Sequence, residues 1–165
     1  MLLLTHPQDL LDLEMVGAPI QQPGGSLSIT DPACGAIAGD GQDDRVAIEA
    51  CISTAQQQGL SVWIPPGTFD LATAATIYVN SIAIAGAGMW HSVMSGTTKF
   101  RCTTNCSFSD FAVFGLERTR RSGSYHAFYG DAGLGTRLTN IWVEHTVRSV
   151  KASPCDFLMS TRVQR

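Results

Sequence analysis

The protein has 165 residues, with 11 Lys and Arg against 14 Asp and Glu, and a formal net charge of -3. A hydrophobic content of 44% argues against an intrinsically disordered chain, and the slight acidic excess argues against a nucleic-acid partner. No apolar run approaches the roughly 18 residues of a membrane-spanning helix, so no membrane partner is expected. Five cysteines are an odd number, so at least one thiol is expected to be unpaired within the chain. The cysteine count does not indicate whether the protein resides in an oxidising or a reducing compartment.

The chain divides into three stretches of different amino-acid composition. Residues 1–35 combine a Leu-rich segment with Pro and Gly and are predicted to be a lead-in and linker; no signal peptide is expected at the start. Residues 36–146 carry the recognisable elements. Residues 147–165 contain four basic residues against one acidic residue, and they lack the Gly and Asn residues that separate the preceding elements. We therefore expect an atypical tail, explained by a truncated or frame-shifted reading frame.

The first strong element is a helix over residues 43–58. Asp43 or Asp44 can cap its start, and Gly59 is suited to end it. Its apolar residues recur with helical spacing and predict one buried face. These residues are Ile48, Cys51, Ile52 and Ala55.

After the helix, short alternating apolar stretches cut by Gly, Pro and Asn predict brief strands. Four stretches share a pattern of one polar residue followed by two apolar residues separated by one position. The polar residues recur at intervals of 20, 29 and 30 positions. Such recurrence fits either stacked coils of a solenoid or unrelated strands of a sandwich. The four stretches begin at Ser61, Ser81, Asp110 and Asn140.

Several strings give the chain a family resemblance. Gly-Asp-Gly at 39–41, the helix at 43–58 and the strand ending in Pro-Pro-Gly at 65–67 resemble the opening of the pectate-lyase-like right-handed β-helix superfamily. Gly-Ala-Gly-Met-Trp at 86–90 and the strand at 140–146 are similar to bacterial α-1,3-glucanases of the mutanase or mycodextranase type.

This resemblance implies an all-β fold, a single-stranded right-handed parallel β-helix with an N-terminal capping α-helix. It also implies an extracellular glycoside hydrolase acting on α-glucan, with polysaccharide as the partner. The resembling enzymes carry catalytic aspartates, including an adjacent pair, on later coils. The one adjacent pair here, Asp43 and Asp44, lies at the helix start, so we expect an N-terminal, inactive fragment of such an enzyme.

Four residues are candidates for carbohydrate binding. If Ile141 and Val143 face inward, Trp142 and Glu144 project outward together, and an indole beside a carboxylate suits a sugar ring and its hydroxyls. His145 could add a donor. The same logic places Trp63 outward, on one face with Ala83 and Ala112. The alternative is that Trp142 packs under a loop and that Glu144 is solvated.

The remaining motifs predict little chemistry. Asp110, Asp131 and Glu144 are the available carboxylates, and structural roles in turns are expected for Asp110 and Asp131. Cys102 and Cys106 predict a thiol pair or a small disulfide loop. No cofactor and no metal site are expected. The alternatives to a hydrolase fragment are a non-catalytic polysaccharide-binding or structural β-helix module, or a pectate-lyase-type enzyme fragment.

Overall fold

The computed structural model describes residues 20–71, 74–115, 126–130, 135–144, 148–151 and 157–160. Within these ranges the chain forms one α-helix and twelve β-strands. The prediction of a mostly β protein with one helix is therefore confirmed. The elements are β1 (Ser26–Ser28), α1 (Arg45–Gln58), β2 (Ser61–Ile64), β3 (Gly67–Leu71), β4 (Thr76–Asn80), β5 (Ala83–Gly86), β6 (Ser92–Gly96), β7 (Lys99–Thr104), β8 (Ser107–Phe114), β9 (His126–Gly130), β10 (Thr136–Glu144), β11 (Arg148–Lys151) and β12 (Phe157–Ser160).

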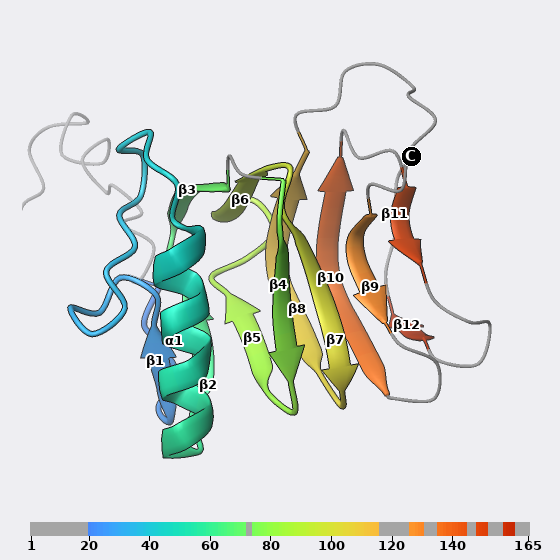
Figure 1. Ribbon diagram of the computed structural model, residues 1–165, viewed down its shortest axis with the longest axis horizontal. Helices are drawn as coiled ribbons and strands as arrows, with labels where there is room; N and C mark the ends of the chain where they lie inside the picture. Colours follow the sequence, from blue (N-terminus) through green and yellow to red (C-terminus); the bar gives the residue numbers. More distant parts are fainter. Residues whose placement is uncertain are drawn as a thin grey trace, which may run out of the picture.

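All of the strand pairs are parallel. The order β1-β2-β5-β8-β10-β12 forms one sheet, to which β3 and β6 are joined through β8, and the order β11-β9-β7-β4 forms the other. Figure 1 shows that the chain progresses from α1 and β1 at one end of the long axis to β11 and β12 at the other. Parallel neighbours separated by such crossovers exclude the antiparallel hairpins of a simple sandwich.

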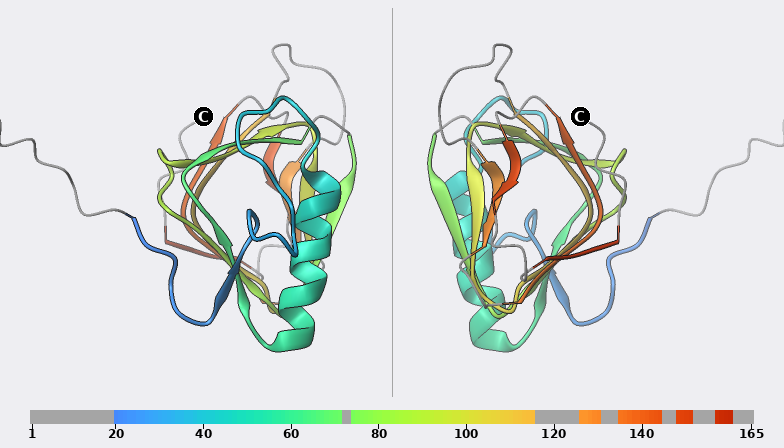
Figure 2. Two further views of the ribbon diagram at one scale, coloured as in Figure 1. Left: turned by 90° about the vertical axis from the view of Figure 1, so that its left-hand side faces the viewer. Right: turned by 90° about the vertical axis from the view of Figure 1, so that its right-hand side faces the viewer.

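Seen along the long axis, the strands surround one interior on three sides (Figure 2). The first side contains β1, β2, β5 and β12 with the first halves of β8 and β10. The second side contains β3, β6 and the second halves of β8 and β10. The third side contains β4, β7, β9 and β11.

A corner divides the two halves of β8 and β10. Asp110 and Asn140 lie at this corner with φ values of 61° and 49°, in the left-handed region that Asp and Asn tolerate better than most residues. The Asn140 Nδ2 donates a hydrogen bond of 2.9 Å to the Asp110 Oδ1. The prediction of a structural role for Asp110 thus agrees with its place at a stacked, hydrogen-bonded turn.

The predicted register is right for the later strands and wrong for the earlier ones. Ile141 pairs with Phe111, as predicted. Val62, however, pairs with Ile84, and Ile84 pairs with Phe108. The β2–β5 pairing differs from the predicted one by two residues, which leaves every side chain on the same face, so apolar alternation alone cannot distinguish these two registers. The β5–β8 pairing differs by five residues, because β5 pairs with the half of β8 that precedes the corner at Asp110.

The helix ends where the sequence predicted, but its start is built differently. Gly59 has a φ of 67°, and its amide donates to the carbonyls of Ala55 and Gln56. Asp43 Oδ1 accepts a hydrogen bond of 3.1 Å from the Arg45 amide, so it serves the first helical residue. Asp44 makes no side-chain cap, in contrast to one of the two expectations.

The predicted buried face of α1 is confirmed. Ile48, Cys51, Ile52 and Ala55 are each no more than 3% exposed. The helix contacts β1, β2 and β4. Because β4 is the last strand of its sheet, α1 covers the open backbone edge of the third side at the start of the stack.

The interior is held by aromatic packing across both sheets and by two disulfides. Phe108 and Phe111 of β8 contact Phe100 of β7 and Phe128 of β9, with ring centroids 5.1–6.1 Å apart. Cys102 and Cys106 form a disulfide, the second of the two predicted alternatives. The disulfide between Cys34 and Cys51 ties the loop before the helix to α1. No helix in the described ranges is long and apolar enough to cross a membrane.

Candidate functional site

The outer surface of the second side brings aromatic and acidic side chains into two columns. One column follows the register Thr68, Val93, Ala112 and Trp142. The other follows Asp70, Ser95, Phe114 and Glu144. The columns end side by side on β10, because Trp142 and Glu144 are separated by one inward residue.

Two indoles and a carboxylate form the centre of this surface, which we name the Trp platform (Trp90, Trp142 and Glu144). The Trp142 Nε1 donates a hydrogen bond of 3.2 Å to the Glu144 Oε2. The ring centroids of Trp90 and Trp142 are 4.8 Å apart, and the ring planes are tilted by 47°. Trp90 is 66% exposed, so its ring remains accessible. The small Ala112 beside Trp142 in the register leaves room for the indole.

A tight turn between β5 and β6 positions Trp90 at the Trp platform. A Cβ on Gly86 would lie 2.3 Å from the Asp110 carbonyl oxygen, so no larger residue fits there. Gly88 has a φ of 134°, a conformation that strongly favours glycine. Ser92 is fully buried, and its hydroxyl donates a hydrogen bond to the Ile64 carbonyl and accepts one from the Ala87 amide. The Gly-Ala-Gly string thus serves close packing and turn geometry.

The predicted site residues have different outcomes. Trp142 and Glu144 lie together on the outer surface, in the arrangement that alternation predicted. His145 lies outside the described residues. Trp63 does not join Trp142 and Glu144: it lies on the first side, where it pairs with Ala85 across the corner from Trp142, and it is only 6% exposed.

Sequence reasoning missed Trp90 as a member of the site. Trp90 belongs to the Gly-Ala-Gly-Met-Trp string, and a Trp after two closely spaced glycines is a signal for an indole displayed on a turn. Its contact with Trp142 joins residues 52 positions apart in the chain, which no local pattern could predict.

Neither Asp70 nor Asp110 forms a hydrolytic pair with Glu144. Asp70 and Glu144 stand in one column with two strands between them, which places them about 14 Å apart at the usual strand spacing. Asp110 lies level with Asn140 on the adjacent strand, and Asn140 precedes Glu144 by four residues, which corresponds to about 13 Å along an extended strand. Glycoside hydrolysis requires separations of about 5 to 9.5 Å. Asp131 lies outside the described residues.

The platform is suited to binding a polyhydroxylated ring. Indole faces pack against apolar C–H surfaces, while the carboxylate accepts hydrogen bonds from hydroxyl groups. Among the described residues, no group of three or more His, Cys, Asp or Glu side chains could hold a metal ion.

Comparisons with known proteins agree with this description. A family model described as rhamnogalacturonase A/epimerase, pectate lyase-like, matches residues 32–154. No curated protein matches significantly. The predicted resemblance to pectate-lyase-like proteins is confirmed by the family match.

Two solved structures are similar over most of the chain. The Agl-KA catalytic domain is 32% identical with a TM-score of 0.66, and the match covers 79% of this chain and 25% of that one. The catalytic unit of a thermostable GH87 alpha-1,3-glucanase from Streptomyces thermodiastaticus strain HF3-3 is 29% identical with a TM-score of 0.65, and the match covers 81% and 24%. The predicted similarity to α-1,3-glucanases is confirmed. The chain spans about a quarter of these solved structures.

Proposed function

The chain belongs to the rhamnogalacturonase A/epimerase, pectate lyase-like family, and on this basis we propose that it forms polysaccharide-binding coils of a glycoside hydrolase that acts on α-glucan. The favoured polymer is α-1,3-glucan, after which one of the similar enzymes, the GH87 alpha-1,3-glucanase, is named. The coils are those of a right-handed parallel β-helix. The parallel register on three sides supports this architecture.

The single observation that carries the proposal is the Trp platform. Trp90 and Trp142 place two indoles in contact on an outer strand surface, beside the Glu144 carboxylate. The surface lies on stacked strands, whose backbones are held rigidly by the ladder hydrogen bonds. A rigid aromatic surface loses little conformational entropy when a sugar ring stacks on it.

The proposed role of these coils is binding without bond cleavage. Neither Asp70 nor Asp110 comes within the separation from Glu144 that glycoside hydrolysis requires. We therefore expect that the purified chain releases no reducing sugar from α-1,3-glucan. Release of reducing sugar would overturn this part of the proposal.

An extracellular location belongs to the same proposal. The disulfides Cys34–Cys51 and Cys102–Cys106 support it, because structural disulfides persist mainly in oxidising compartments. The similarity to polysaccharide-degrading enzymes supports it further, since polymers of this kind are met outside the cell.

Titration of indole fluorescence with α-1,3-linked glucan oligosaccharides tests the proposed binding. We expect a saturable change with the native chain, and about tenfold weaker binding in Trp142→Ala, equivalent to about 1.4 kcal/mol. Tyr78→Ala is the matched control, because Tyr78 is a 60% exposed aromatic residue on the third side. It should bind like the native chain.

The outcomes separate the proposed role from a purely structural module. Absence of any saturable response to α-glucan oligosaccharides would favour a β-helix that serves only as a scaffold. Equal losses in Trp142→Ala and Tyr78→Ala would contradict the platform as the binding surface.

A further inference from the structure

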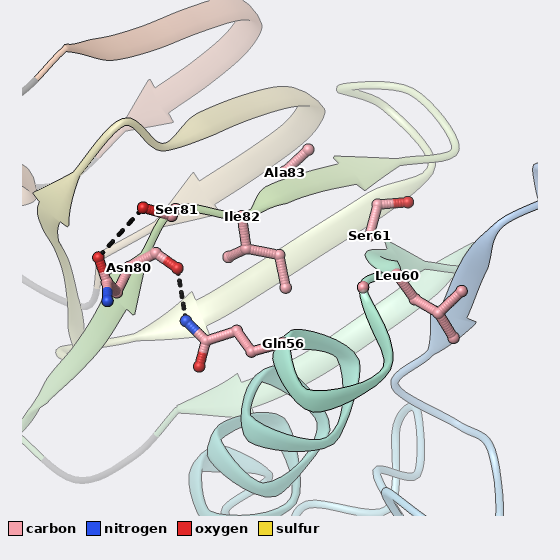
Figure 3. A pocket seen from close by; sticks show the side chains of 8 residues that line it. Gln56, Leu60, Ser61, Asn80, Ser81, Ile82 and Ala83 are labelled. Atoms are coloured by element: carbon pink, nitrogen blue, oxygen red, sulfur yellow. Dashed lines mark hydrogen bonds between the residues drawn. The ribbon is translucent and has the colours of Figure 1, made fainter.

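A surface pocket lies between the end of α1 and the turn that connects β4 to β5 (Figure 3). Its volume is about 540 Å³, within the range of small-molecule sites, roughly 300 to 1,000 Å³. Its lining includes Gln56, Ser61 and Asn80 together with Ile82 and Ala83. Ser61 and Ala83 begin their strands, whereas the Trp platform lies beyond the corner on the second side, so the two sites are separate.

The walls of the pocket are fixed by hydrogen bonds. The Gln56 Nε2 donates to the Asn80 carbonyl and joins the helix to the β4–β5 turn (Figure 3). The Ser81 amide donates to the Thr104 carbonyl at 2.6 Å and anchors that turn on the next strand. The Ser61 amide donates to the Gly25 carbonyl at 3.0 Å. A ligand would therefore meet a pre-formed surface and would not have to order it.

The lining chemistry is neutral and mixed. Gln56, Ser61, Asn80 and Ser81 supply amide and hydroxyl groups, and Figure 3 shows Ile82 between the amide side and Ser61. The Gln56 and Asn80 side chains each keep one polar atom outside the bonds that join the walls, the Gln56 Oε1 and the Asn80 Nδ2. Acceptors, donors and an apolar floor together match the hydroxyls and C–H faces of a sugar ring.

We propose that this pocket is a second carbohydrate site, which takes one ring of a neutral saccharide. None of its lining side chains carries a charge, so neither a carboxylate nor an ammonium group on the ligand would find an ion-pair partner. The pocket also lies at the C-terminal end of α1, where the helix dipole disfavours anions. The site holds a saccharide at the start of the strand stack, away from the Trp platform.

The test follows backbone amide shifts in NMR spectra of the whole chain during titration with glucose and an α-1,3-linked glucose disaccharide. We expect saturable shifts at Gly59 and Ser81 with a Kd in the millimolar range, about 4 kcal/mol. Glucuronic acid, which adds one carboxylate to the same ring, should bind at least several-fold more weakly at neutral pH.

Two pairs of variants localise the response. Ala83→Arg places a long side chain at the exposed pocket wall and should abolish the shifts, whereas Ala50→Arg makes the same change at an exposed helix position outside the pocket. Gln56→Ala should weaken binding, whereas Gln57→Ala should not. Binding that survives Ala83→Arg, or a lack of saturable shifts at Gly59 and Ser81, would overturn the pocket.

The same titration distinguishes this pocket from the Trp platform. In Trp142→Ala, the saturable amide shifts at Gly59 and Ser81 should be the same as in the native chain. Shifts confined to Trp90 and Trp142 would overturn the second site and leave the proposed function standing, while shifts confined to the pocket would do the reverse.

Discussion

Asp44 shows how one side chain organises a segment of the chain. It is 5% exposed, and its carboxylate accepts hydrogen bonds from the Ile37 amide at 2.9 Å and the Asp70 amide at 3.0 Å. The residue thereby joins the loop before the helix to β3. Burial raises the pKa of this carboxyl above 3.8, and the nearby Asp40 and Asp70 raise it further, against the opposing effect of the two amide bonds.

The raised pKa predicts how Asp44 affects stability at different pH. The folded chain binds the Asp44 proton more tightly than the unfolded chain, so its contribution is largest below pH 3.8 and falls as pH rises through the folded pKa. Asp44→Asn removes this titration. We expect the unfolding free energy of the native chain, relative to that of Asp44→Asn, to decrease from about pH 3 to pH 6 in urea titrations.

The control for this experiment is the neighbouring carboxylate. Asp43→Asn removes an exposed carboxyl from the same helix start. A relative stability that stays constant or increases over this range for Asp44→Asn would contradict the assigned environment.

At the scale of elements, α1 protects a sheet edge. Ile52 is 3% exposed on the helix face that contacts β1, β2 and β4. In Ile52→Asp a carboxylate would be buried without a partner or the helix would separate from the strands, and the edge of β4 would be open to pairing with other chains. We expect a loss of more than about 3 kcal/mol and aggregation.

Thermal unfolding and size-exclusion chromatography check this prediction. Ser53→Asp places the same carboxylate on the adjacent exposed helix position and should leave both measurements close to native. A soluble Ile52→Asp protein with an unchanged melting temperature would show that the helix is dispensable for the stack.

The elements also show what the sequence can and cannot predict. Local patterns located α1 and its buried face, because helical spacing and a C-terminal glycine act within the segment itself. The role of Asp44 depends on amides at residues 37 and 70, and the burial of Trp63 depends on the strands around it. Alternation correctly placed Trp142 and Glu144 on one surface, but it could not reveal Trp90 as their neighbour.

At the scale of the whole molecule, the aromatic cluster joins the two sheets. Phe128 of β9 is fully buried and contacts Phe100, Phe108 and Phe111, with centroids 5.7, 5.1 and 6.0 Å away. It therefore contacts strands from both sheets. The stack gains its cohesion in this interior as well as in the backbone ladders.

Phe128→Ala should be among the most damaging changes to the core. The cavity and the lost apolar burial predict a cost of about 3 to 5 kcal/mol, measured by urea unfolding. Phe114→Ala removes the same side chain from a position that is 36% exposed, and it should cost about 1 kcal/mol or less. Similar costs for the two variants would contradict a core centred on this cluster.

The parallel arrangement of the whole molecule agrees with the recurrence found in the sequence, although the intervals alone left a sandwich open. The family resemblance predicted parallel strands more directly than spacing did, because it drew on the order of the Gly-Asp-Gly loop, the helix and the Pro-Pro-Gly strand. The three sides and the sharing of β8 and β10 between two of them depend on corner geometry at Asp110 and Asn140.

The bridge between Cys34 and Cys51 encloses the exposed residues 37–43 in a covalent ring of chain. A protease that cut this ring once would leave both new ends attached to the same body through sulfur. Among the residues that the structure describes, the longest exposed run is therefore also one in which a single cut would not divide the molecule.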